Sequence, residues 1–187
     1  MHRVCVVLAN GFEEIEAVTV IDVLRRAGVE VTMLGVDGAE ITGSHGISVK
    51  ADAVLAEEAD RRWDIVILPG GLPGAHTLRD SEAVQALIRR QHAAGGKLAA
   101  ICAAPIALGK AGVLAGRRAT SYPGFESELH GAEVVAEPVV RDRELLTSRG
   151  PGTAMEFALA LVSDLKGEEE ASELRKRMLV GGREARG

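Results

Sequence analysis

Cys102 is the residue whose setting most suggests chemistry, because it lies where two elements meet in the segment KLAAICAAPIALGK, residues 97–110. The apolar run 97–101 is typical of a buried parallel strand, and the apolar spacing over 103–110 predicts a helix. A sharp strand-to-helix turn lifts its middle side chain above the sheet, and small neighbours such as Ala103 permit it. Free N–H groups at a helix start favour thiolate over thiol. The segment therefore predicts a cysteine nucleophile.

The elements that would hold this cysteine alternate along the chain. Buried or short strands are expected at 4–9, 29–36, 65–68, 97–101, 117–121, 133–140 and 144–147. Helices are expected at 13–27, 52–62, 80–94, 103–110, 154–165 and 168–180. This alternation predicts a doubly wound α/β fold, with a mostly parallel sheet and helices on both faces. Ligands on such sheets bind beyond the carboxyl ends of the strands, where Asn10, Gly70, Cys102 and Ser148 would lie.

Composition limits the class of protein. The 187 residues suit one domain over 1–187, with a core at about 4–180 and a frayed tail at 181–187. The net charge of −5 argues against nucleic acid or an anionic membrane as a partner. The apolar run at the start is too short for a signal peptide, and no apolar run is long enough to span a membrane. Two distant cysteines suit a reducing compartment, so we expect a cytoplasmic protein.

Four segments at the predicted strand ends carry a family resemblance. ANGFEEIEA, LPGGLPGA, AAICAAP and TSRGPGT resemble the signatures of the ThiJ/PfpI superfamily, in the branch of the Parkinson's-disease-associated protein deglycase and its bacterial relatives. The resemblance runs from about Val4 to Leu165, nearly the whole chain. It implies a flavodoxin-like fold of the class I glutamine amidotransferase-like kind, and a homodimer.

The resemblance also assigns roles to residues. It implies that Cys102 is the nucleophile and that the Glu16 carboxyl lies beside its sulfur. A carboxyl buried against a thiolate has a raised pKa, so Glu16 would stay protonated, donate to sulfur and shuttle protons. Gly70-Gly71 forms a strand-ending turn, and the N–H groups of Gly71 and Ala103 would form an oxyanion hole. Gly70 would line the pocket.

Three pocket positions are less settled. Tyr122 stands where relatives often have histidine, so a Cys-His dyad would lack its base and peptidase activity is not expected. His45 stands where relatives often have a pocket arginine, with an ordinary surface histidine as the alternative. Arg26 is expected near the partner subunit and its pocket. The neighbouring Glu13 and Glu14 are interpreted as solvated or as complements of the helix dipole.

Two function classes share these residues. The first is a glyoxalase III-like or deglycase-like enzyme, a lyase or hydrolase that turns methylglyoxal into lactate through a Cys102 hemithioacetal and also acts on glycated proteins. The second is a non-enzymatic oxidative-stress sensor or redox-regulated chaperone that works through Cys102 oxidation. A hydrolase or hydratase of another small electrophile is a third reading. The histidines and cysteines show no zinc spacing, and no nucleotide-binding motif follows a strand, so no metal and no cofactor are expected.

Overall fold

The centre of the molecule is a seven-stranded sheet with the strand order β10-β11-β7-β6-β1-β2-β5. The structure is a computed structural model that describes residues 2–181; the predicted frayed tail lies outside these residues except for Gly181. The sheet strands are β1 Arg3–Leu8, β2 Glu30–Gly35, β5 Ala53–Val54, β6 Ile65–Leu68, β7 Lys97–Ile101, β10 Val139–Asp142 and β11 Leu145–Ser148. Strands β1, β6 and β7 are apolar almost throughout and lie in the middle, because both faces of a central parallel strand are covered.

The strands of this sheet are parallel except at one edge. β1 pairs with β2 and β6, β6 with β7, and β7 with β11, all in parallel. The edge strand β10 runs antiparallel to β11, joined to it by a tight turn in which Arg143 has a φ of 55°. The carboxyl ends of β1, β6, β7 and β11 therefore meet at one edge of the sheet, as the sequence predicted.

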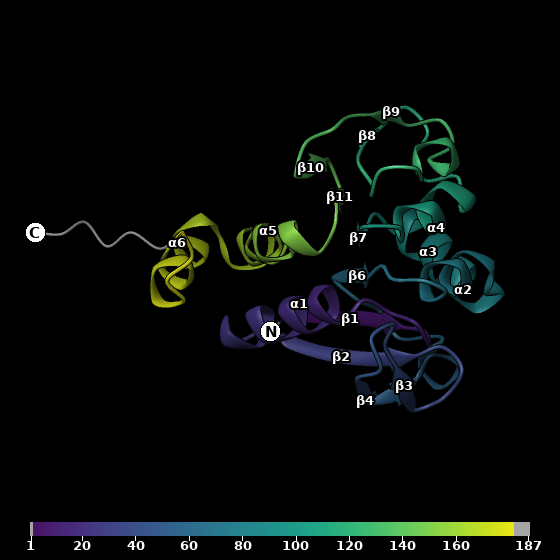
Figure 1. The fold of residues 1–187 in the computed structure, drawn as a ribbon, viewed down its shortest axis with the longest axis horizontal. Helices are drawn as coiled ribbons and strands as arrows, with labels where there is room; N and C mark the ends of the chain where they lie inside the picture. Colours follow the sequence, from purple (N-terminus) through teal and green to yellow (C-terminus); the bar gives the residue numbers. More distant parts are fainter. Residues whose placement is uncertain (1, 182–187) are drawn as a thin grey trace, which may run out of the picture.

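The helices form two groups on the two sides of the sheet (Figure 1). They are α1 Glu14–Arg26, α2 Gly74–Asp80, α3 Glu82–Ala93, α4 Pro105–Lys110, α5 Ala154–Lys166 and α6 Glu168–Arg177. α1 packs against α5 and α5 against α6, whereas α2 packs against both α3 and α4. This arrangement confirms the predicted doubly wound α/β fold. Among the described residues, no helix is both long and apolar enough to cross a membrane.

Two sequence predictions of local structure are wrong, and one short helix was not predicted. The helix expected over 52–62 is instead strand β5 followed by a 3-10 turn, Leu55–Glu58, because this segment completes the sheet edge beside β2. The helix expected over 80–94 is confirmed as α3, which begins after Ser81, whose side chain accepts from the Val84 N–H, whereas α2, Gly74–Asp80, was not predicted. The strand expected over 133–140 is divided between β9, Glu133–Val134, and β10, with Pro138 between them.

Two small sheets lie outside the main one. β3, Glu40–Thr42, and β4, Ser48–Lys50, form an antiparallel hairpin. The β3–β4 loop lies against the start of α1, because the Ser44 N–H donates to the Phe12 carbonyl. β8, Arg118–Ala119, pairs in parallel with β9. The segment after β8 leads directly to Tyr122.

Candidate active site

Cys102 occupies the turn between β7 and α4 that the sequence predicted. Its φ is 65°, a left-handed conformation that is uncommon for a residue with a side chain. Two backbone hydrogen bonds hold it there: the Cys102 N–H donates to the Ser148 carbonyl at 2.9 Å, and the Tyr122 N–H donates to the Cys102 carbonyl at 2.8 Å. Such strain persists only where the surroundings impose it, and it is typical of functional sites. The elbow is thus fixed by the end of β11 and by Tyr122.

The thiol of Cys102 is more enclosed than the sequence suggested. The residue is only 9% exposed, not lifted into solvent. Burial raises the pKa of the Cys102 thiol to about 12, and the charge and hydrogen bond of ionised Glu16 add to this, while the N–H groups of Ala103 and Gly71 oppose it. A helix start is therefore not enough to ionise this thiol. Its ionisation depends on the protonation of the neighbouring carboxyl.

Glu16 lies on the first turn of α1 and is completely buried. Its Oε2 accepts from the Gly70 N–H at 2.8 Å, whereas its Oε1 is buried without a hydrogen-bond partner among the described residues. Burial raises the pKa of Glu16 to about 7, although the hydrogen bonds with Cys102 and with the Gly70 amide act to lower it.

Glu13 positions Glu16, a role that the sequence did not reveal. It is the N-cap of α1, and its Oε2 accepts from the Glu16 N–H at 2.7 Å. Glutamate is not among the residues preferred at this position, so a pattern search for caps would overlook it. The cap fixes the first turn of α1 and with it the direction of the Glu16 side chain.

The two glycines after β6 stand where there is no room for a side chain. A Cβ on Gly70 would lie 2.6 Å from the Cys102 Cβ and 2.8 Å from Glu16 Oε2. Gly71 has a φ of 92°, and a Cβ there would lie 2.3 Å from the Glu13 backbone nitrogen. The absence of both side chains lets the Gly70 amide reach the carboxyl and the Gly71 amide reach the sulfur.

His45 and Glu14 form a separate pair beside this centre. Glu14 is buried, contrary to the expectation of a solvated residue. It accepts from the His45 N–H at 2.7 Å and lies 3.0 Å from His45 Nδ1. Burial acts to raise the pKa of Glu14, but its hydrogen bonds with His45 and Ile47 hold that pKa at about 2. The His45 side chain is 72% exposed, and its pairing with Glu14 raises its pKa.

The same pair brings three possible metal ligands together, which the sequence did not predict. One ligand atom each from Glu13, Glu14 and His45 lie within 4.8 Å of one another. The oxygens of Glu14, however, already accept hydrogen bonds from the β3–β4 loop. This network explains the cluster as the device that anchors the loop to α1.

The other predicted pocket residues fall in different places. Tyr122 is 47% exposed and borders the elbow through its N–H bond to the Cys102 carbonyl. Arg26 is the last residue of α1, ten residues beyond Glu16, or about 15 Å along the helix. It pairs with Asp22 at 2.7 Å. Arg26 therefore lies away from the elbow of its own chain, and its expected place near a partner subunit stays a prediction.

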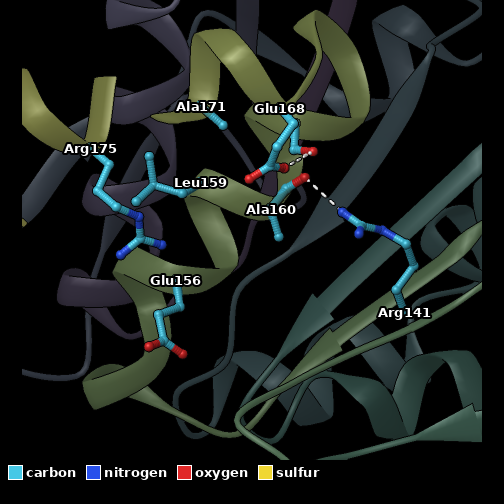
Figure 2. A pocket seen from close by; sticks show the side chains of 8 residues that line it. Arg141, Glu156, Leu159, Ala160, Glu168, Ala171 and Arg175 are labelled. Carbon is cyan, nitrogen blue, oxygen red and sulfur yellow. Dashed lines mark hydrogen bonds between the residues drawn. The ribbon is translucent and has the colours of Figure 1, made fainter. Parts of the chain in front are cut away.

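A second hollow, between α5, α6 and β10, is distant in sequence from these groups (Figure 2). Arg141 donates to the Ala160 carbonyl at 3.0 Å and pairs with Asp164, and Glu168 accepts from the Ser163 hydroxyl at 2.7 Å. These charges are thus used to hold the helices and the sheet edge together. Neither Cys102 nor Glu16 lines this hollow, so the elbow remains the candidate active site.

The comparisons with known proteins agree with this geometry. Protein dj-1beta of Drosophila melanogaster is 45% identical over 178 residues, which cover 94% of this chain and 95% of that protein. The crystal structure of Drosophila melanogaster DJ-1beta matches with a TM-score of 0.93 and 43% identity, covering 96% of this chain and 98% of that one. A protein of Caenorhabditis elegans named glutathione-independent glyoxalase DJR-1.2 is 34% identical over 165 residues, 88% of each chain.

The match to a family model is equally extensive. The model described as the DJ-1/PfpI family matches residues 2–164, which include the elbow, the glycine turn and the whole of α1. The predicted resemblance to the ThiJ/PfpI superfamily is thereby confirmed. The chain belongs to the DJ-1/PfpI family.

Proposed function

We propose that this protein is a cysteine enzyme that converts small α-oxoaldehydes such as methylglyoxal to 2-hydroxy acids such as lactate. The observation that carries the proposal is the meeting of the Cys102 thiol, the Glu16 carboxyl and the N–H groups of Gly71 and Ala103. The name of the Caenorhabditis elegans relative, a glutathione-independent glyoxalase, supports the same reaction class.

The thiol and the carboxyl share one proton over a wide pH range. Burial disfavours the charged form of each group, and two neighbouring negative charges repel, so the doubly ionised state is disfavoured. The singly protonated pair exists as thiol with carboxylate or as thiolate with carboxylic acid. In the second form, the protonated carboxyl of Glu16 donates to the thiolate, which stabilises the charge on sulfur.

The first chemical step is the addition of sulfur to the aldehyde. The thiolate electron pair forms the C–S bond while the carbonyl π electrons move to oxygen, giving a hemithioacetal oxyanion. The N–H groups of Gly71 and Ala103 would bind this oxyanion, an interaction that typically contributes on the order of 100- to 1000-fold per donor. Glu16 then gives its proton to the oxyanion and becomes a carboxylate.

The second step is a proton transfer within the bound substrate. The Glu16 carboxylate removes the C1 hydrogen as a proton, and the C1–H electrons form a C1–C2 double bond while the C2 carbonyl π electrons move to oxygen, giving an enediolate. The hydroxyl proton on the C1 oxygen passes to the C2 oxygen, and Glu16 returns its proton to C2 as the C1 carbonyl forms, giving the thioester. A pKa of about 7 suits a group that must both give and accept a proton near neutral pH. Water then hydrolyses the resulting thioester, releasing the 2-hydroxy acid and restoring the thiol. The scheme needs no cofactor.

Glycated proteins are further proposed substrates. The same addition chemistry extends to early glycation adducts on proteins, which release a dicarbonyl.

A homodimer is supported by apolar side chains that point outward from α1, Ile15 at 58% and Val18 at 48% exposed. Val23 of the same helix is buried in the core and does not belong to this face. The cytoplasm remains the proposed location because Cys5 and Cys102 are both free thiols.

A redox role through the same cysteine is the second candidate. Amide N–H groups around the sulfur, with a protonated carboxyl beside it, would also stabilise a sulfinate formed by stepwise oxidation. A redox sensor would leave a dicarbonyl unchanged, whereas the proposed enzyme would convert it to a 2-hydroxy acid.

The deciding experiment measures lactate formed from methylglyoxal by the purified protein without glutathione. We expect turnover by the wild type, none by Cys102→Ser, and nearly full turnover by Cys5→Ala, because Cys5 is buried within β1. Equal turnover by Cys102→Ser and wild type would refute the proposal. No turnover by the wild type, together with a stable sulfinate on Cys102 after peroxide treatment, would favour the redox role.

A further inference from the structure

A groove borders the elbow on the side of Tyr122. It has a volume of about 230 Å³ and is lined by Tyr122, Pro123 and the loop Arg149–Thr153. Both of its walls bond to the backbone of the nucleophile, since Tyr122 donates to the Cys102 carbonyl and Ser148, just before the loop, accepts from the Cys102 N–H. The groove therefore lies next to the candidate active site, although neither Cys102 nor Glu16 lines it.

The walls of this groove are held in place. Ser148 Oγ donates to the Pro138 carbonyl at 2.7 Å and lies 2.6 Å from Thr153 Oγ1, which also accepts from the Gly150 N–H at 3.1 Å. A Cβ on Gly150 would lie 3.2 Å from Tyr122 Cδ2. Glycine at this position therefore gives the aromatic ring room to lie against the loop. A fixed loop reduces the ordering that a ligand would otherwise have to impose.

Arg149 brings a positive charge to the groove, and the sequence analysis did not single it out. It is partly buried, and it forms no ion pair with any residue from 2 to 181. Glu137, which precedes the Pro138 carbonyl that accepts from the Arg149 N–H, is already paired with Arg118. The Arg149 guanidinium is therefore available to an anionic group of a ligand.

We propose that the Tyr122–Arg149 groove binds the anionic end of the substrate, so that the preferred substrates are α-oxoaldehydes that carry a carboxylate. The aldehyde lies at Cys102, and the carboxylate reaches Arg149 along the Tyr122 ring. Arg149 contacts a part of the substrate that does not react, so it determines specificity and takes no part in the chemistry. The inference rests on the proposed function for its reaction, but the binding groove can be tested without turnover.

The first measurement compares two alkylating agents that differ in charge. The Cys102 thiolate displaces iodide from both iodoacetate and iodoacetamide, so the ratio of the two alkylation rates cancels any change in thiolate fraction. At low salt, where charge attraction is least screened, Arg149→Met should lower the iodoacetate-to-iodoacetamide ratio and Arg149→Lys should keep much of it. Arg89→Met, on the exposed face of α3, is the control with the same change in net charge.

The second measurement compares two substrates, 4,5-dioxopentanoate, which carries a carboxylate, and neutral methylglyoxal. Loss of one charge-assisted hydrogen bond should lower the ratio of their kcat/KM values in Arg149→Met by roughly tenfold to hundredfold, mainly through KM. Arg89→Met should keep the wild-type ratio.

The outcomes separate the two proposals. An alkylation ratio in Arg149→Met equal to that in Arg89→Met would overturn the anion-binding groove, whatever the turnover. Absence of turnover of both substrates by the wild type would overturn the proposed reaction, while a lowered alkylation ratio would still support the groove.

Discussion

The free energy of unfolding of the wild type should fall as the pH rises toward neutrality, because Glu16 loses a proton that the folded state favours. Glu16→Gln should not show this fall. Glu16 is fully buried, and burial raises its pKa to about 7 from an ordinary 4.5. The folded protein therefore holds this proton more tightly than the unfolded chain does. Glutamine keeps the size and the acceptor for the Gly70 N–H, but it has no proton to lose in this range.

The sign and size follow from linkage. For a carboxyl with a raised pKa in the folded state, the contribution to stability is fully present below the unfolded pKa and is lost as the pH rises through the folded one. At about 1.4 kcal/mol per pH unit, a rise from 4.5 to about 7 corresponds to a loss on the order of 3 kcal/mol. Most of it should fall between pH 4.5 and 7, and the curve should level above that.

The assay is urea unfolding of wild type and Glu16→Gln at matched protein concentration over this pH range. The difference between their unfolding free energies isolates Glu16, because other groups, such as Glu14 with its pKa of about 2, titrate alike in both. We expect the wild type to lose stability relative to the variant by an amount of this order. If the unfolding free energies of the wild type and the variant changed equally with pH, Glu16 would already be ionised at low pH. The shared-proton scheme would then be incorrect.

Three further predictions concern the elbow and the outer face of α1. Gly70→Ala should remove nearly all dicarbonyl turnover and lower the melting temperature, because its Cβ would meet the Cys102 Cβ at 2.6 Å; near-normal turnover would contradict this crowding. Tyr122→Phe should cost less than about 100-fold in turnover, the scale of one general acid–base group, since Glu16 carries the protons; a larger loss would assign a proton to the phenol. Val18→Asp should convert a homodimer to a monomer in light scattering at micromolar concentration, and a wild-type monomer throughout would remove the dimer.

The sequence alone determined the elements that have a strong local signal. The apolar runs of β1, β6 and β7 predicted the central strands, because a strand buried on both faces needs apolar side chains at nearly every position. The change of spacing after Cys102 predicted the elbow, and the four segments at the strand ends predicted the family. Helix α2, Gly74–Asp80, was not predicted, because seven residues that begin with glycine give too short a periodic pattern.

Tertiary structure decided what depends on neighbours from distant segments. The protonation of Cys102 depends on burial and on Glu16, which lies 86 residues earlier in the sequence. Likewise, the hairpin loop draws Glu14 out of solvent, and the length of α1 carries Arg26 away from the elbow. Arg149 gained its significance only when the fold placed its loop beside Tyr122. A pKa or a binding groove arises from desolvation and from charges brought together in space, and residue order does not encode these distances directly.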